Sequence, residues 1–232
     1  MTPNSPPSRF VAAIDGPAGS GKSTLAKLLA EKIGGVYIDT GAMYRAVTAR
    51  ALDAAIAPSN ESAVGEIADS INIEFKREGA LQKTFVDGVD FSARIRQPDV
   101  NASVSIVAAQ SAVRKRMVAL QREMGKHGRV VMEGRDIGTN VFPDADVKFF
   151  LVADDTVRAK RRLAEMDAKA ANVNHDTVLA NLRERDAIDS TRAEAPLRKA
   201  EGAVEIDTSD LTIDQVLQNM LKIIPFSPDK TG

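Results

Sequence analysis

The sequence "GPAGSGKS", from Gly16 to Ser23, is the feature that most constrains the fold of this chain. It fits the pattern G-x-x-x-x-G-K-[ST], and it stands between the apolar run "FVAAI" and a segment with helical apolar spacing. A glycine turn with a chance lysine is the alternative, but both flanks match a phosphate-binding loop. Such a loop turns its backbone N–H groups and the positive end of a helix toward phosphate. The motif therefore predicts a nucleoside triphosphate site, with Lys22 near the β- and γ-phosphates and the Ser23 hydroxyl near Mg²⁺.

Five short apolar runs predict a parallel sheet around this loop. They are "RFVAAID", "GGVYID", "GRVVME", "DVKFFLVA" and "GAVEID", and each is apolar along its length, as expected of strands buried on both faces. Helical patterns separate them; Leu25, Leu28, Leu29 and Ile33, for example, share one face after the glycine loop. The alternation favours an α/β fold with a five-stranded parallel sheet flanked by helices.

One segment departs from this alternation. "INIEF", "KTFV" and "VDF" read as three short strands with no helix between them, and Asp87-Gly88 is a strong two-residue hairpin turn. We therefore expect a small antiparallel three-stranded insertion at 65–101, within a core formed by 9–64 and 102–226. The polar ends, 1–8 and 227–232, are expected to be flexible.

Composition excludes several classes of function. The chain has no cysteine, so disulfides and thiolate metal sites are excluded, and its two histidines, His127 and His175, lie far apart in the sequence. A net charge of −1 provides no general basic field for nucleic acid. No apolar run is long enough to span a membrane, and the N-terminal segment does not resemble a signal peptide. We expect a cytoplasmic protein that binds small molecules, with neither nucleic acid nor membrane as a partner.

Two predicted strands end in segments that carry arginine. They are "IDTGAMYR", which contains Arg45, and "VVMEGRDIGT", which contains Arg135 and Asp136. Ligands bind at the carboxyl edge of a parallel sheet, and a forked guanidinium suits phosphate. Arg45 could instead be a solvated helix arginine, and Arg135 and Asp136 could form a structural ion pair. A GTPase is not favoured, because no Asn-Lys pair of a base-reading N-K-x-D motif occurs.

Charged residues at helical spacing share faces in two later segments. They are Arg158, Arg161 and Arg162 in "VRAKRRLAE", and Arg185, Asp189 and Arg192 in "RERDAIDSTR". Two solvated helices with local ion pairs are the simpler interpretation. Beside a phosphate loop, however, they predict a mobile helical lid within about 154–192 that closes over the triphosphate and excludes water.

An ordered set of motifs resembles the bacterial cytidylate kinases of the nucleoside monophosphate kinase superfamily. The stretches are "IDGPAGSGKST", "DTGAMYR", "VDGVDFSARIR", "EGRDIGTNVFPDADVKFFL", "RAKRR" and "RERDAIDSTRAEAPL", and the likeness extends from about residue 10 to 222. It implies a P-loop kinase fold in which the insertion lies on the monophosphate-binding side. It also implies phosphorylation of CMP and dCMP by direct in-line transfer, with ATP as donor, Mg²⁺ as cofactor and a monomeric enzyme. Thr40 is one departure, since serine is frequent there, but the hydroxyl is kept.

The resemblance assigns roles residue by residue. Lys22, Arg158, Arg161 and Arg162 are the implied catalytic residues. The implied ATP site is Gly16, Pro17, Ala18, Gly19, Ser20, Gly21, Lys22, Ser23 and Thr24, with Ser23 also the metal ligand. The implied CMP site is Thr40, Arg45, Ser105, Arg114, Arg135, Asp136, Arg185, Asp189 and Arg192. Within it, Arg45 and Arg135 would hold the acceptor phosphate, Ser105, Arg114 and Asp136 would read cytosine, and Arg185 and Asp189 would lie near the sugar.

Base chemistry agrees with the role given to Asp136. Cytosine presents an amino donor at position 4, which a carboxylate accepts, whereas uracil presents an acceptor there. Two other functions stay open: a P-loop kinase for a different nucleotide or metabolite, and a nucleotide-binding regulator without transfer activity. A panel of acceptors assayed for ADP release separates the three.

Overall fold

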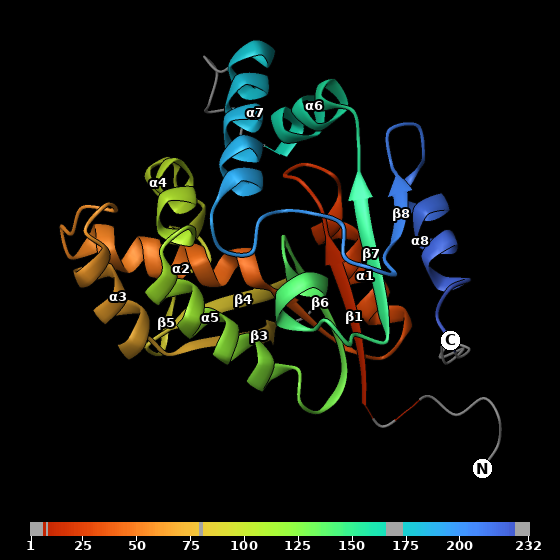
Figure 1. Ribbon diagram of the computed structural model, residues 1–232, viewed down its shortest axis with the longest axis horizontal. Helices are drawn as coiled ribbons and strands as arrows, with labels where there is room; N and C mark the ends of the chain where they lie inside the picture. The colour runs from red at the N-terminus through yellow and green to blue at the C-terminus, as the bar shows by residue number, and fades with distance from the viewer. Residues whose placement is uncertain (1–6, 8, 79–80, 166–173, 226–232) are drawn as a thin grey trace. The chain divides into compact units, whose positions relative to one another are not determined.

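The computed structural model describes residues 7, 9–78, 81–165 and 174–225 and forms two compact units (Figure 1). The first unit comprises Met1–Tyr37 and Gly125–Gly232, and the second comprises Ile38–Met124. Within its described residues the first unit contains β1 (Arg9–Asp15), α1 (Lys22–Lys32), β6 (Gly128–Gly134), the π-helical turn η2 (Ile137–Val141), β7 (Val147–Val152), α6 (Asp155–Glu165), α7 (His175–Thr191), β8 (Val204–Asp207) and α8 (Ile213–Leu221). Strand β2 (Val36–Asp39) crosses the boundary between the units.

The predicted five-stranded parallel sheet is confirmed. Its strand order is β2-β6-β1-β7-β8, so the chain's first strand lies at the centre. The parallel register sets Asp15 opposite Gly134 of β6 and Val152 of β7 opposite Asp207 of β8. The phosphate loop and the segments that follow β6, β7 and β8 therefore all leave the sheet at its carboxyl edge, where α/β proteins bind ligands.

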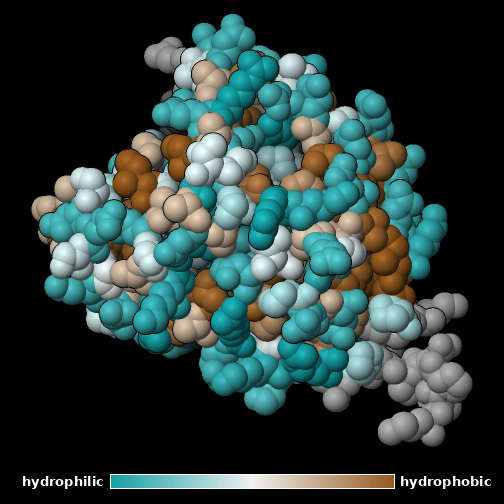
Figure 2. Space-filling view, in the orientation of Figure 1, coloured by the Kyte–Doolittle hydropathy of each residue, from teal (hydrophilic) through white to brown (hydrophobic). Residues whose placement is uncertain are grey.

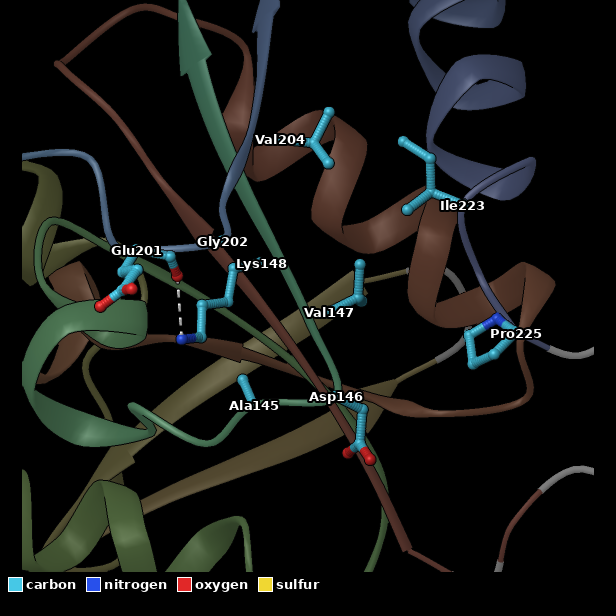
Figure 3. A pocket seen from close by; sticks show the side chains of 9 residues that line it. All are labelled: Ala145, Asp146, Val147, Lys148, Glu201, Gly202, Val204, Ile223 and Pro225. Carbon is cyan, nitrogen blue, oxygen red and sulfur yellow. Dashed lines mark hydrogen bonds between the residues drawn. The ribbon is translucent and has the colours of Figure 1, made fainter.

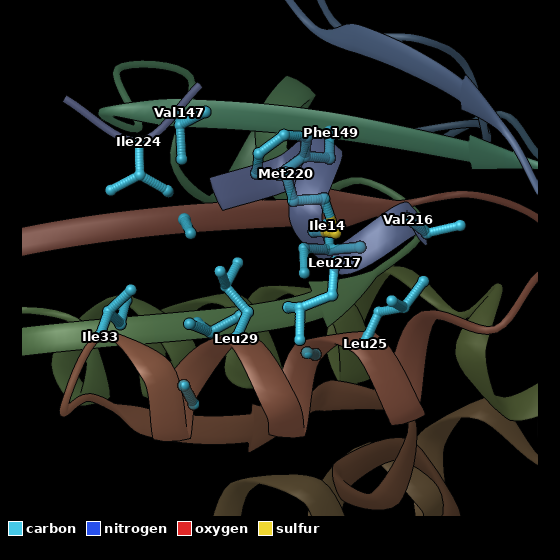
Figure 4. Packing of buried hydrophobic residues seen from close by; sticks show 14 of the residues in the cluster. Ile14, Leu25, Leu29, Ile33, Val147, Phe149, Val216, Leu217, Met220 and Ile224 are labelled. Atoms are coloured by element: carbon cyan, nitrogen blue, oxygen red, sulfur yellow. The ribbon is translucent and has the colours of Figure 1, made fainter. Parts of the chain in front are cut away.

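A hydrophobic core fixes the helix that follows the phosphate loop. Leu25 and Leu29 of α1, and Ile33 at its C-cap, pack with Phe149 of β7 and Met220 of α8, and all five side chains are at most 2% exposed (Figure 4). The spacing of Leu25, Leu29 and Ile33 reproduces the apolar face expected from the sequence. Truncating one such side chain, as in Leu29→Ala, typically costs about 2–5 kcal/mol. The start of α1 is thus held on a rigid support.

The second unit combines helices with the small antiparallel sheet. Its elements are α2 (Thr40–Asp53), α3 (Glu61–Ser70), β3 (Ile73–Glu78), β4 (Leu81–Val86), β5 (Val89–Asp90), the 3₁₀ turn η1 (Arg94–Arg96), α4 (Pro98–Ala108) and α5 (Ser111–Met124). The sheet is three-stranded and antiparallel, as the sequence predicts, and its strand order is β3-β4-β5. Asp87 and Gly88 have φ of 50° and 82°, the left-handed values that a type I′ hairpin turn requires.

The domain boundaries expected from the sequence remain predictions. The segment 65–101 covers the small sheet, but its ends fall inside α3 and α4, and the compact unit is larger. The predicted flexible ends lie outside the described residues apart from Pro7, as do 166–173 of the predicted lid. Among the helices that the structure describes, none combines the length and apolar character needed to cross a membrane.

Candidate active site

The phosphate loop joins β1 to α1 through glycines that no other residue could replace without strain. A Cβ on Gly16 would lie 2.1 Å from the backbone oxygen of Leu151, and Gly16 has a φ of 146°. A Cβ on Gly19, whose φ is 76°, would lie 3.1 Å from Arg158. Gly21 is the N-cap of α1 and supplies no side-chain hydrogen bond to the helix amides. The first turn of α1 thus begins without a side-chain cap, which is the arrangement that binds an anion.

Lys22 is the first residue of α1 and is buried. Its ammonium donates to the backbone oxygen of Pro17 at 2.5 Å and to the Ser20 hydroxyl at 3.3 Å. The pKa of Lys22 is lowered to about 7, mainly because burial disfavours the charged form and because Arg135 adds a like charge; Glu133 acts in the opposite direction. A phosphate group beside it would favour the charged form.

Two hydroxyl groups at the start of α1 offer oxygen atoms to a metal ion. Ser23 and Thr24 are exposed at the start of α1. Within the part of the chain that the structure describes, no cluster of three or more His, Cys, Asp or Glu side chains could hold a metal ion. This donor set suits Mg²⁺, which keeps several waters and binds mainly to substrate phosphates with only one or two protein oxygens.

Strand β6 leads into a charged network that also involves α7. Arg135 Nε donates to Asp189 Oδ2 at 2.8 Å. Arg192 Nη2 lies 3.3 Å from Asp136 Oδ1, and Asn140 Nδ2 donates to Asp136 Oδ2 at 3.0 Å. The structure therefore brings together four of the predicted acceptor-site residues, and each of the two carboxylates lies beside an arginine.

The charges in this network stabilise one another. Burial alone would raise the pKa of Asp189, but Arg135, Arg185 and Arg192 outweigh burial and hold it below its usual range. Burial would lower the pKa of Arg135, but the Asp189 carboxylate outweighs burial and holds this pKa above its usual value. The Asp189 carboxylate is therefore ionised at neutral pH in the midst of positive charge, which suits binding of a polar, anionic ligand.

The arginines of α6 differ in their surroundings, and one of them contacts the phosphate loop. Arg158 is buried, donates to the backbone oxygen of Ala18 at 3.0 Å and to Asp186 Oδ2 at 2.6 Å, and pairs with Asp155. Arg161 donates to the hydroxyl and the backbone oxygen of Thr208, at 2.9 and 2.6 Å. Arg162 is half-buried.

A small apolar cluster joins the two helices of the predicted lid. Ala159 of α6 packs with Val178 and Leu182 of α7, and Ala18 of the phosphate loop packs against them. The two helices thus contact the phosphate loop through few apolar side chains, which is compatible with local opening of this region.

In the second unit the predicted residues lie on α2, α4 and α5. Asp39 caps α2 by accepting from the Ala42 amide at 2.8 Å, and it pairs with Arg45 at 3.4 Å. Arg114 of α5 is buried, with its guanidinium carbon 5.7 Å from the centre of the Tyr44 ring. Two further predicted residues lie in the same unit: Thr40 is buried at the start of α2, and Ser105 is half-buried on α4.

Sequence reasoning missed several residues that hold these groups in place. They are Asp15, Asp39, Tyr44, Asn140, Asp186 and Thr208. Asp15 and Asp39 end strands directly before a glycine-containing motif, which is a signal that could have found them. Asn140 lies only four residues after Asp136, in the same motif. Tyr44, Asp186 and Thr208 depend on contacts between distant segments.

Two surface hollows lie on the first unit. The first, of about 340 Å³, is lined at the amino ends of β7 and β8 by Val147, Lys148 and Val204, with Glu201 and Ile223 (Figure 3). It lies at the edge of the sheet opposite the phosphate loop. Figure 2 shows exposed apolar surface on the side where Figure 1 places β8 and α8, and Val204 and Ile223 are both 37% exposed.

The second hollow, of about 570 Å³, lies at the carboxyl ends of β7 and β8 and includes Asp154, Asp207 and Asp210. It is close to the phosphate loop, because the Thr208 hydroxyl lies 3.2 Å from the backbone oxygen of Ser20. This hollow therefore belongs to the same edge as the candidate active site.

A phosphate loop at the carboxyl edge of a parallel sheet, flanked by helices that carry arginine, defines the chain as a P-loop kinase of the α/β class. A family model described as cytidylate kinase matches residues 12–225. A cytidylate kinase of Syntrophotalea carbinolica is 48% identical over 93% of this chain and 92% of its own length. Those of Lactobacillus gasseri (48% identical, 91% of this chain, 92% of its own) and Geobacter sulfurreducens (45%, 93%, 92%) are similar. The chain belongs to the cytidylate kinase family and is a phosphotransferase.

Proposed function

We propose that this chain transfers the γ-phosphoryl group of ATP to CMP and dCMP. The observation that carries the proposal is the phosphate loop, with its uncapped helix start and buried lysine, at the same edge of the sheet as the Arg135–Asp189 and Arg192–Asp136 pairs. Family membership supports cytidine monophosphate as the acceptor, since the relatives are named for it. The proposal rests on these two supports together.

The donor triphosphate would bind along the loop from Gly16 to Thr24. Lys22 would leave Pro17 for the β- and γ-phosphates, and Ser23 would offer its hydroxyl to Mg²⁺, which neutralises phosphate charge when bound. The hollow at the carboxyl ends of β7 and β8 has room for the donor base. Arg158, Arg161 and Arg162 would supply positive charge to the transferring group when the helices α6 and α7 close.

The acceptor would be held by phosphate contacts and read at its base. Arg45 and Arg135 would bind its phosphate, since guanidinium groups match phosphate oxygens in a bidentate manner. Asp136 would accept a hydrogen bond from the cytosine amine, with Ser105 and Arg114 at the same base. Arg185, Asp189 and Arg192 would contact the rest of the nucleotide.

The reaction needs no covalent intermediate with the protein. A phosphate oxygen of the acceptor attacks the γ-phosphorus, the bond to the β–γ bridging oxygen breaks, and ADP leaves as the acceptor becomes a diphosphate. The attacking oxygen is already anionic, so no strong general base is required. The protein's contribution is positioning and electrostatic stabilisation of the equatorial oxygens.

An acceptor panel tests the proposal. Purified protein with ATP and Mg²⁺ is given CMP, dCMP, UMP, AMP, GMP or no acceptor, and ADP release is measured. CMP and dCMP should support turnover far above the rate without acceptor. Activity on a different acceptor alone would indicate another small-molecule kinase, and ATP binding without any acceptor-dependent turnover would indicate a regulator.

A further inference from the structure

Asp15 is a buried carboxylate to which neither the motif nor the proposed reaction assigns a role. It is 3% exposed and is the last residue of β1, directly before Gly16 of the phosphate loop. An ionisable group so placed is costly to bury unless its oxygens are hydrogen-bonded. Its partners therefore indicate what it does.

Both oxygens of Asp15 accept hydrogen bonds from one short turn. The Ile137 amide donates to Oδ1 at 2.9 Å, and the Gly138 amide donates to Oδ2 at 2.7 Å. These amides begin the π-helical turn η2, directly after Arg135 and Asp136. The sheet register explains the approach, because Asp15 lies opposite Gly134, the last residue of β6.

The clamped turn determines where the Asp136 side chain lies. Asp136 has φ of −144° and ψ of 25°, so the chain leaves the extended geometry of β6 at this residue and enters the turn. The backbone of Asp136 also accepts from the Asn140 and Val141 amides, which closes the turn. Asp15 fixes the amides of the two residues that follow Asp136. Asp136 can therefore present its carboxylate to Arg192 and Asn140.

We propose that Asp15 is the positioning residue that ties the acceptor-reading turn to the phosphate loop, so that Asp136 is held for base recognition before the acceptor arrives. This inference rests on the proposed function. Asp15 touches neither nucleotide; it acts through the backbone of η2. A carboxylate is required because each of its two oxygens accepts a hydrogen bond from one of the two neighbouring N–H groups, those of Ile137 and Gly138.

The variant Asp15→Asn tests this role. Its amide oxygen can accept from one N–H, but its NH₂ group meets the other N–H donor to donor. The KM for CMP should rise by about tenfold or more, because small misplacement of a recognition group has large kinetic effects. The ratio of kcat/KM for CMP to that for UMP should fall, whereas the KM for ATP should change by less than about threefold.

Asp146→Asn is the matched control. Asp146 also accepts from a backbone amide of β1, that of Val11 at 2.7 Å, but at the other end of the strand. The same chemical change there should leave the KM for CMP and the CMP/UMP ratio at the parent's values. A purely structural role for Asp15 would lower stability without changing base selectivity.

Three outcomes overturn the inference: Asp15→Asn keeps the parent's KM for CMP and its selectivity, the KM for ATP rises as much as that for CMP, or Asp146→Asn has the same effect. If the parent protein did not phosphorylate CMP, the proposed function itself would be refuted. If Asp15→Asn fails to fold, hydrogen exchange of backbone amides in the parent tests the inference instead. The Ile137 and Gly138 amides should exchange slowly with and without CMP; rapid exchange that only CMP slows would show that substrate, not Asp15, orders the turn.

Discussion

Replacing Asp15 by asparagine should change how the stability of the protein depends on pH. The pKa of Asp15 is raised from 3.8 to about 6, chiefly because burial disfavours the carboxylate. The Gly138 and Ile137 amides oppose this shift, Asp136 adds to it through like charge, and Lys22 opposes it. The folded protein therefore binds the Asp15 proton more tightly than the unfolded chain does.

The sign and the size of the pH effect on stability follow from this difference in proton affinity. Stability from a raised carboxyl pKa is present below about pH 3.8 and is lost as pH rises through about 6. A shift of about two pKa units corresponds to about 3 kcal/mol in total. About 2 kcal/mol of this falls between about pH 4.5 and about pH 7.5. Relative to Asp15→Asn, the parent should lose that much free energy of unfolding over this range.

Urea unfolding of both proteins at several pH values measures the effect. The free energy of unfolding of the parent minus that of Asp15→Asn should fall with rising pH and level off above about pH 7. Gly202→Ala is a non-titrating control, and its profile should run parallel to the parent's. A difference between parent and Asp15→Asn that stays constant, or that grows in the parent's favour as pH rises, would refute the reasoning.

Three further predictions concern the phosphate loop and the lid. Gly16→Ala should prevent folding or cost several times more stability than Gly202→Ala, because both positions have positive φ but an added Cβ meets the Leu151 backbone oxygen only at Gly16; thermal unfolding compares them. Lys22→Ala should lower turnover by several orders of magnitude with a Tm close to the parent's; a variant that kept more than about a tenth of the activity, a loss of only about 1.4 kcal/mol, would remove the lysine from its proposed role. Hydrogen exchange in peptides from α6 and α7 should be fast in the free protein and slow with both nucleotides bound; equal protection in both states would rule out a lid.

Much of the fold could be predicted from the sequence because its signals are local. The five apolar runs became β1, β2, β6, β7 and β8, and Asp87-Gly88 forms the expected turn. The phosphate loop could be predicted for the same reason: glycines with positive φ leave a direct trace in the sequence.

The support of the site could not be predicted in this way. Asp15 meets Ile137 and Gly138 across more than a hundred residues, and the contact exists only because the register sets Asp15 opposite Gly134. The sequence also could not predict that the guanidinium of Arg158 is buried, where it donates to the Ala18 backbone oxygen and to Asp186. Such partners depend on how distant elements pack, which periodicity does not encode.

The ratio of kcat/KM for CMP to that for UMP tests the central claim most directly. An ionised Asp136 would accept from the cytosine amine, but with uracil it would face an acceptor and lose that bond, at a cost of about 1–3 kcal/mol or more. Sites built on such hydrogen bonds discriminate by about 10⁴ or more. We expect CMP to exceed UMP by several orders of magnitude, and Asp136→Asn to narrow the ratio chiefly by lowering turnover of CMP. A parent enzyme that uses UMP within about tenfold of CMP, a gap near 1.4 kcal/mol, would contradict the account.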